Sequence, residues 1–150
     1  MKLYAESSAI LAWLLGEPVG EDVRGLLAEA AEVFSSVITL VEADRVLIRA
    51  QVIDGLREGD VADRRGVLAR ASRHWHLLQL HEEILDRARR PFPREPIRTL
   101  DALHLASALV ARVAVPELAV LSLDSRIRKT TSDLGFEVFP LSGGTLSGRP

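Results

Sequence analysis

The apolar residues of this chain follow two spacings, one typical of strands and the other of helices. Short apolar segments predict strands at 2–5, 33–37, 118–123 and 136–139, and segment 76–80 is ambiguous but compatible with one more strand. Segment 118–123 is apolar almost throughout, as in strands of a parallel sheet that is covered on both faces. Between these segments, apolar residues recur every three to four positions, which indicates amphipathic helices.

Glycine, proline and hydroxyl residues mark the ends of these helices. Ser7 or Ser8 can cap a first helix, which Gly16-Glu17-Pro18 ends, and a second follows from Val19 to Ala30. Further helices are predicted at 39–50, 60–73, 82–90, 101–113 and 125–134. Strands that alternate with helices indicate an α/β fold: a three-layer α/β/α sandwich with a mostly parallel sheet of four to five short strands.

Length and composition agree with one globular domain. The chain has 150 residues, of which 47% are hydrophobic and 27% charged, and no cysteine. We expect one domain over 1–141 and a loose glycine- and serine-rich tail over 142–150. No apolar run has the length of a membrane span and no secretory signal is apparent, so a cytoplasmic location is the default expectation. The net charge of −2 leaves room for a local basic groove.

Four carboxylates are predicted to meet at one edge of the sheet. Glu6 and Asp124 follow predicted strands, while Glu42 and Asp101 lie near the starts of helices that lead away from the same edge. Acids gathered in a partly buried space repel one another unless a cation is present. Oxygen ligands without cysteine suit Mg²⁺, with Mn²⁺ as a second choice, and such a site is suited to metal-assisted phosphodiester hydrolysis.

Each acid also has a purely structural interpretation. Thr39 and Glu42 fit a capping box, Asp101 lies in the first turn after a Thr99 cap, and Asp124 can cap the following helix. Glu6 has no obvious structural partner. The functional interpretation depends on the four acids acting together.

Four segments resemble motifs of the PIN-domain ribonucleases, in particular the VapC-like toxins of type II toxin–antitoxin systems. The segment from Tyr4 to Ala9 is similar to the family's Y-x-D-[ST]-S-A, and that from Ser36 to Glu42 to its S-x-x-T-x-x-E. The segment from Arg98 to Ala106 is similar to R-x-x-D-A-x-x-x-A, the most specific of the four. Leu121 to Asp124 is similar to the strand-end [TS]-x-D.

This resemblance implies a function and a site. It implies that the four acids bind the metal and catalyse RNA cleavage, and it implies a cognate antitoxin and a homodimer. Side chains that support the site or contact phosphate would be Ser8, Ser122, Arg98 and Arg126. One departure matters: the family usually has aspartate where this chain has Glu6, and a carboxylate displaced by about 1 Å can cost about 10²-fold in rate.

The basic and histidine residues near these acids have ordinary alternatives. Arginines precede Asp101 and basic residues follow Asp124, so both groups are candidates for holding RNA phosphates, although a solvated charged surface is as good an explanation. His104, one turn from Asp101, is expected to pack or hydrogen-bond between the sheet and a helix. The other three histidines do not share a face that would hold a metal.

Three functions are therefore compared. The first is a Mg²⁺-dependent endoribonuclease toxin that cleaves structured RNA and is silenced by its antitoxin. The second is a PIN-like module that binds RNA or protein but has lost efficient cleavage, with Glu6 as the cause. The third, a phosphorylation receiver domain, expects a pair of acids at the first strand, whereas Ser7 and Ser8 follow Glu6 here.

Overall fold

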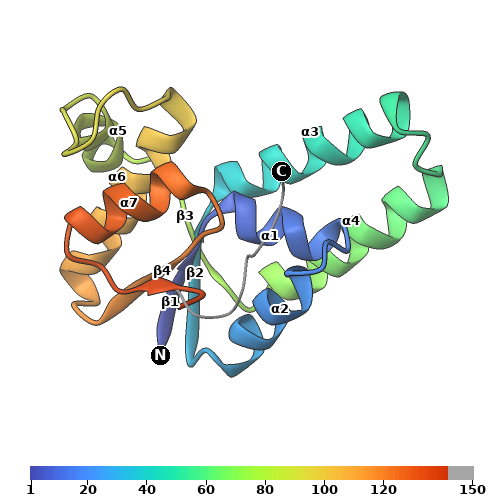
Figure 1. The fold of residues 1–150 in the computed structure, drawn as a ribbon, viewed down its shortest axis with the longest axis horizontal. Helices are drawn as coiled ribbons and strands as arrows, with labels where there is room; N and C mark the ends of the chain where they lie inside the picture. Colours follow the sequence, from blue (N-terminus) through green and yellow to red (C-terminus); the bar gives the residue numbers. More distant parts are fainter. Residues whose placement is uncertain (142–150) are drawn as a thin grey trace.

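A five-stranded parallel sheet forms the centre of the fold. The computed structural model describes residues 1–141, and the predicted tail at 142–150 lies outside these residues. The strands have the order β3-β2-β1-β4-β5, and each neighbouring pair is parallel (Figure 1). Their bounds are β1 (Lys2–Ala5), β2 (Glu32–Ser36), β3 (His76–Leu78), β4 (Leu118–Leu121) and β5 (Val138–Phe139). The predicted α/β class is confirmed, and the ambiguous segment 76–80 does contain a strand.

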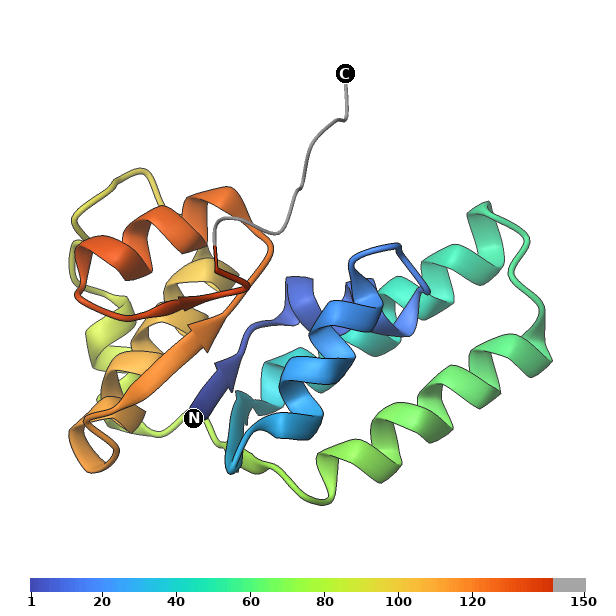
Figure 2. The same cartoon turned by 60° about the horizontal axis from the view of Figure 1, so that its bottom comes forward.

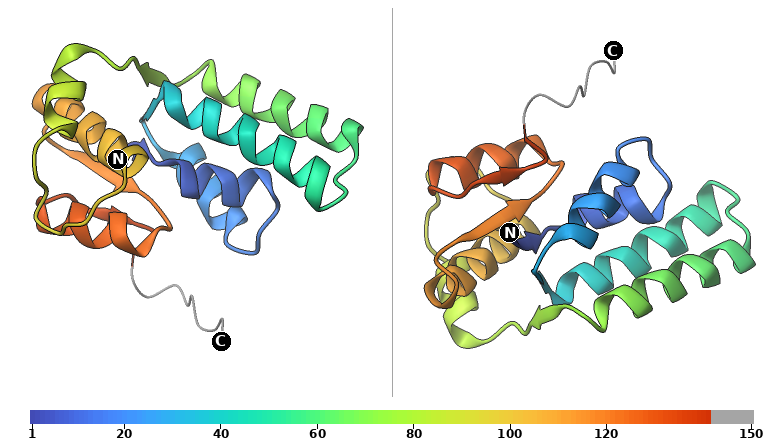
Figure 3. Two further views of the ribbon diagram at one scale, coloured as in Figure 1. Left: turned by 90° about the horizontal axis from the view of Figure 1, so that it is seen from above. Right: turned by 90° about the horizontal axis from the view of Figure 1, so that it is seen from below.

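Seven helices lie on the two sides of this sheet within the described residues. The first group is α1 (Ser7–Leu14), α2 (Gly20–Glu29), α3 (Val37–Ile53) and α4 (Glu58–Ser72). The second group is α5 (Glu82–Ala88), α6 (Thr99–Ala114) and α7 (Ser125–Asp133). Figures 2 and 3 show the two groups on either side of the strands, with the α3–α4 hairpin extending away from the sheet. No helix in residues 1–141 combines the length and the apolar character needed to cross a membrane.

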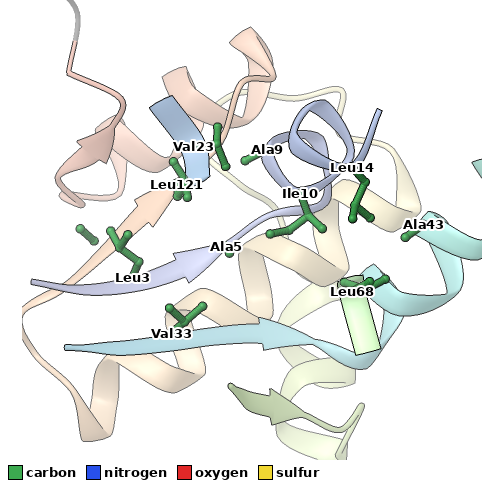
Figure 4. Packing of buried hydrophobic residues seen from close by; sticks show 11 residues of the cluster. Leu3, Ala5, Ala9, Ile10, Leu14, Val23, Val33, Ala43, Leu68 and Leu121 are labelled. Atoms are coloured by element: carbon green, nitrogen blue, oxygen red, sulfur yellow. The ribbon is translucent and has the colours of Figure 1, made fainter. Parts of the chain in front are cut away.

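Alternate residues of β1 point into two different cores. Leu3 and Ala5 pack with α1 to α4 in one apolar cluster, which Figure 4 shows from close by. Tyr4, between them in sequence, belongs to the cluster on the other face, with Ala108 and Ala111 of α6. This alternation is the ordinary consequence of strand geometry. It places the phenol of Tyr4 beneath α6, the helix that carries Asp101 and His104.

Close packing of α1 against α2 depends on a glycine. A β-carbon added at Gly20 would lie 2.6 Å from the backbone oxygen of Ala12, which is far inside van der Waals contact. Glycine therefore lets the start of α2 approach α1. Since Glu6 stands at the start of α1, this packing also helps to hold one corner of the acidic site.

The structure corrects several predicted element bounds. The helix predicted at 39–50 begins at Val37, because the hydroxyl of Ser36 accepts a hydrogen bond from the amide of Ile38 at 3.2 Å and caps the helix there. The strand predicted at 118–123 ends at Leu121, since the amide of Leu123 donates to the hydroxyl of Ser8 rather than to a neighbouring strand. Side chains, rather than apolar periodicity, set these bounds.

Candidate active site

Two of the four predicted acids lie just beyond the carboxyl ends of strands, and the other two lie in helices. Glu6 directly follows β1 and caps α1, and Asp124 follows β4 and caps α7. Because β1 and β4 are parallel neighbours, these two acids leave the same edge of the sheet. Glu42 lies in α3 after β2, and Asp101 lies in the first turn of α6.

Glu6 is buried and its carboxylate is fully hydrogen-bonded. Only 3% of the surface of Glu6 is exposed to solvent. Oε1 accepts from the Ser7 hydroxyl at 2.8 Å and the Ser8 amide at 3.1 Å, while Oε2 accepts from the Ser8 hydroxyl and from the Ser122 hydroxyl at 2.8 Å. A carboxylate has about four acceptor positions, so these donors occupy all of them. The expectation that Glu6 lacks a structural partner is wrong, because its neighbours in α1 and after β4 surround it with donors.

Ser8 and Ser122 connect Glu6 to the backbone that carries Asp124. The Ser8 hydroxyl accepts from the amides of Leu123 at 2.9 Å and Asp124 at 3.2 Å. The Ser122 hydroxyl also accepts from the amide of Asp124, at 3.2 Å. Since each hydroxyl gives its hydrogen to Glu6, both serines act here as links within the site, and their hydrogens are not directed to a ligand.

Glu42 is tied to Glu6 on one oxygen and to a histidine on the other. The Ser7 hydroxyl lies 2.8 Å from Oε1 of Glu6 and 3.1 Å from Oε2 of Glu42, so its single hydrogen is shared between two carboxylates. Oε1 of Glu42 lies 2.7 Å from Nε2 of His104. The capping-box interpretation of Glu42 is wrong, because α3 begins at Val37 with Ser36 as its N-cap, and the Thr39 hydroxyl accepts a hydrogen bond from Ser35 of β2.

Asp124 caps α7 through one of its oxygens. Oδ1 accepts from the amides of Arg126 at 2.9 Å and Ile127 at 3.1 Å. The structural interpretation of this residue is therefore confirmed as one of its roles. The hydrogen bonds found for its side chain all use Oδ1, so Oδ2 has no donor among residues 1–141.

Asp101 is the carboxyl whose ionisation the site opposes. Burial raises the pKa of Asp101, and the negative charges of Asp124 and Glu6 raise it further, against the smaller opposing effects of Arg98 and His104. The guanidinium of Arg98 lies 3.8 Å from Oδ2, at the limit of an ion pair, and is mostly exposed. Arg98, rather than Thr99, occupies the N-cap position, and no side chain caps α6 there.

The chemistry of these residues fits a hard divalent cation. The available donors are carboxylate oxygens. Burial raises the pKa of Asp101 most, and the added repulsion from Asp124 and Glu6 is the kind that a cation relieves. As the side chains stand in residues 1–141, however, no three acidic or histidine groups lie close enough together to hold one ion. Glu6 would have to release serine donors before it bound a metal directly, so Asp101 and Asp124 present the freer oxygens.

The arginines near the site divide into two kinds. Arg126 and Arg98 are exposed beside Asp124 and Asp101, in keeping with a role at the mouth of the site. Arg128 instead donates to the backbone oxygens of Ser122, Phe139 and Pro140 and joins the ends of β4 and β5. Arg94 pairs with Asp133, and Arg87 stacks over Phe92, so these too have structural partners.

Three residues of the site were not predicted as such from the sequence. Ser7 bridges two acids, His104 contacts Glu42 from the core, and Tyr4 contacts His104. His104 does hydrogen-bond between the sheet and α6 as expected, but its contact with Glu42 was not predicted. Its position three residues after Asp101, on the same helix face, was the available signal.

Comparison with known proteins assigns the chain to a family. Residues 3–132 match the family model of the PIN domain, and the chain belongs to this family. Its resemblance to the VapC-like members is confirmed by relatives in Mycobacterium tuberculosis. The chain is 33% identical to Ribonuclease VapC46 over 136 residues, covering 91% of this chain and 95% of the relative. It is 29% identical to Ribonuclease VapC35 over 138 residues, covering 91% and 94%.

Solved structures of the same fold include toxins and toxin–antitoxin complexes. VapC20 of Mycobacterium tuberculosis, described as a sarcin-ricin loop cleaving toxin, aligns with a TM-score of 0.61 and 16% identity over 89% of this chain and 95% of that one. VapBC2 of Rickettsia felis, bound to a DNA fragment from its promoter, gives a TM-score of 0.61 with 8% identity over 92% and 97% of the chains. At these identities the likeness concerns the fold.

Proposed function

We propose that this chain is a metal-dependent endoribonuclease and the toxin of a toxin–antitoxin pair. The observation that carries the proposal is the convergence of four acids: Ser7 joins Glu6 to Glu42, and Glu6 and Asp124 both raise the pKa of Asp101. The family and the relatives named as ribonucleases support the reaction class. Mg²⁺, or Mn²⁺ in its place, is the proposed cofactor, held by Glu6, Glu42, Asp101 and Asp124.

The proposed roles of the individual residues follow from their hydrogen bonds. When bound, the metal would lower the pKa of a water and neutralise charge that develops on the phosphodiester. Asp101 and Asp124 offer oxygens with few donors, and Glu42 is oriented from both sides. Glu6 shapes the site through the serines. Arg98 and Arg126 are exposed beside the acids and suited to contact RNA phosphates.

A cleavage assay with metal control tests this proposal. The protein would be treated with a chelator and incubated with structured RNA, first alone and then with added Mg²⁺ or Mn²⁺. We expect cleavage only with metal, and only in the parent protein, not in Asp101→Asn. Cleavage that persists in the chelated protein, or in the variant, would remove these acids from the reaction.

One observation favours the second candidate, a PIN-like module without efficient cleavage. All four acceptor positions of Glu6 are occupied by protein donors, which hinders direct coordination of a metal. Tight RNA binding with no cleavage in either metal would support this alternative. A metal titration separates the two, since the nuclease requires binding of Mg²⁺ or Mn²⁺.

The proposed partners are structured RNA, a cognate antitoxin protein and a second copy of the chain, in the cytoplasm. Toxin–antitoxin complexes among the structural neighbours support the antitoxin. A single monomeric species in light scattering at high concentration would contradict the homodimer.

A further inference from the structure

Tyr4, His104 and Glu42 form a line of hydrogen bonds that runs from the core to the acidic site. The phenol oxygen of Tyr4 lies 2.9 Å from Nδ1 of His104, and Nε2 lies 2.7 Å from Oε1 of Glu42. Both Tyr4 and His104 are only 1% exposed. Because each ring nitrogen has a partner, the imidazole cannot turn without breaking both contacts.

The direction of these hydrogen bonds follows from the chemistry of the groups. A carboxylate can only accept, so the hydrogen between His104 and Glu42 belongs to Nε2. Burial raises the pKa of the Tyr4 phenol and outweighs the opposing contact with Ser107, so the phenol keeps its proton and can donate it to Nδ1. The imidazole with its hydrogen on Nε2 therefore satisfies every partner.

We propose that His104 is a positioning residue, which orients Glu42 for metal binding and is itself oriented by Tyr4. The inference rests on the proposed function, in which Glu42 is a metal ligand. The His104 ring holds Oε1 of Glu42 while Ser7 holds Oε2, so the plane of the carboxylate is set from both sides. Partners that orient a metal ligand in this way commonly contribute a factor of about 10–100 to metal affinity.

Two amide variants separate positioning from simple core packing. In His104→Gln the terminal amide nitrogen can reach the place of Nε2 and still donate to Glu42. In His104→Asn the shorter amide reaches only the place of Nδ1, toward Tyr4, and the donor to Glu42 is lost. The two variants differ in reach but not in charge, so each is the control for the other.

Binding of Mn²⁺, followed by electron paramagnetic resonance, is the readout. We expect His104→Asn to raise the Kd for Mn²⁺ by about 10-fold or more and His104→Gln to restore most of the affinity. Unchanged affinity in both, or an equal loss in both, would overturn the positioning role. Thermal unfolding shows whether each variant is folded.

Nitrogen NMR of the parent protein tests the inference without any metal or activity. The ¹⁵N shifts of His104 should show a hydrogen on Nε2, and Tyr4→Phe should alter the Nδ1 signal. A neutral ring with its hydrogen on Nδ1 would overturn the inference even if cleavage were found. Conversely, a parent protein that shows the expected ring but binds no Mn²⁺ would contradict the proposed function and leave the hydrogen-bonded line in place.

Discussion

The Glu6 side and the Asp101 side of the acidic site use their carboxylate oxygens in opposite ways. Glu6 is 3% exposed and receives hydrogen bonds on all four acceptor positions. Asp101 has a side chain 21% exposed, a distant arginine as its ion-pair partner, and a pKa raised by burial and by neighbouring acids. A carboxylate whose acceptor positions are all occupied stabilises the fold and fixes the geometry of the site. A carboxylate that is repelled by neighbouring acids lowers stability and remains available to a cation.

The largest effect is expected from Asp101→Asn. Removing this charge should lower metal-dependent RNA cleavage by on the order of 10²-fold or more, because the freest candidate ligand is lost. Stability should stay unchanged or rise, since the repulsion from Asp124 and Glu6 disappears. Cleavage rates and thermal unfolding measure the two effects, with Asp63→Asn on exposed α4 as the control. A variant that melts well below the parent would show that Asp101 serves mainly the start of α6.

Glu6→Asp tests the other side of the comparison. The shorter side chain should retract by about 1 Å and lose contact with Ser122 or Ser8, because the present backbone is built around a glutamate. We expect the fold to persist with stability lowered by about 1–3 kcal/mol, and both metal affinity and cleavage to fall. Calorimetric Mn²⁺ titration and a cleavage assay measure this.

Two other results of Glu6→Asp would change the interpretation. Faster cleavage would mean that the backbone has not adapted to the longer acid. Identical metal affinity and rate would remove residue 6 from the ligand set, leaving Glu42, Asp101 and Asp124.

The pH dependence of stability should report on Asp101 in the metal-free protein. Its pKa is raised above the ordinary 3.8, so the unfolded chain releases this proton before the folded chain does. Stability from this group is therefore complete below pH 3.8 and is lost as the pH rises through the folded pKa. Urea unfolding with chelator present should show that, as the pH rises from 3.8 to the folded pKa, the free energy of unfolding of Asp101→Asn increases relative to that of the parent. A constant difference would contradict the raised pKa.

The smallest effect is expected from Ser7→Ala. Loss of the shared hydroxyl leaves Glu42 with His104 as its partner and Glu6 with three donors. We expect about 1 kcal/mol lower stability and a smaller loss of cleavage than in Asp101→Asn. Ser132→Ala, exposed on α7, is the matched control in unfolding and cleavage assays. An effect on cleavage as large as that of Asp101→Asn would mean that the shared hydroxyl of Ser7 is essential for positioning Glu6 and Glu42.

Apolar spacing was sufficient to predict the order of strands and helices, because most helices bury one face and the central strands bury both. Apolar spacing did not predict where α3 begins or where β4 ends, because the hydroxyls of Ser36 and Ser8 set these two positions. Glu6 and Asp124 were identified from their places after strands, and Glu42 and Asp101 from their places near the starts of helices. The partners of Glu6 were not, because Ser122 is 116 positions away and reaches it only in the folded sheet.

The serines that donate hydrogen bonds to Glu6 restrict how this site can change in evolution. Ser7, Ser8 and Ser122 match the reach of a glutamate, and their hydroxyls would lose their acceptor if residue 6 alone became shorter. The motif Y-x-D-[ST]-S-A, which this segment resembles, keeps the same serines beside an aspartate, so an exchange of glutamate for aspartate here requires the backbone between β1 and α1 to bring the shorter carboxylate to the same hydroxyls. Without that shift the buried hydroxyls would be poorly paired, which carries a cost in free energy. The length of the acid at residue 6 and the path of the backbone that carries it therefore change together.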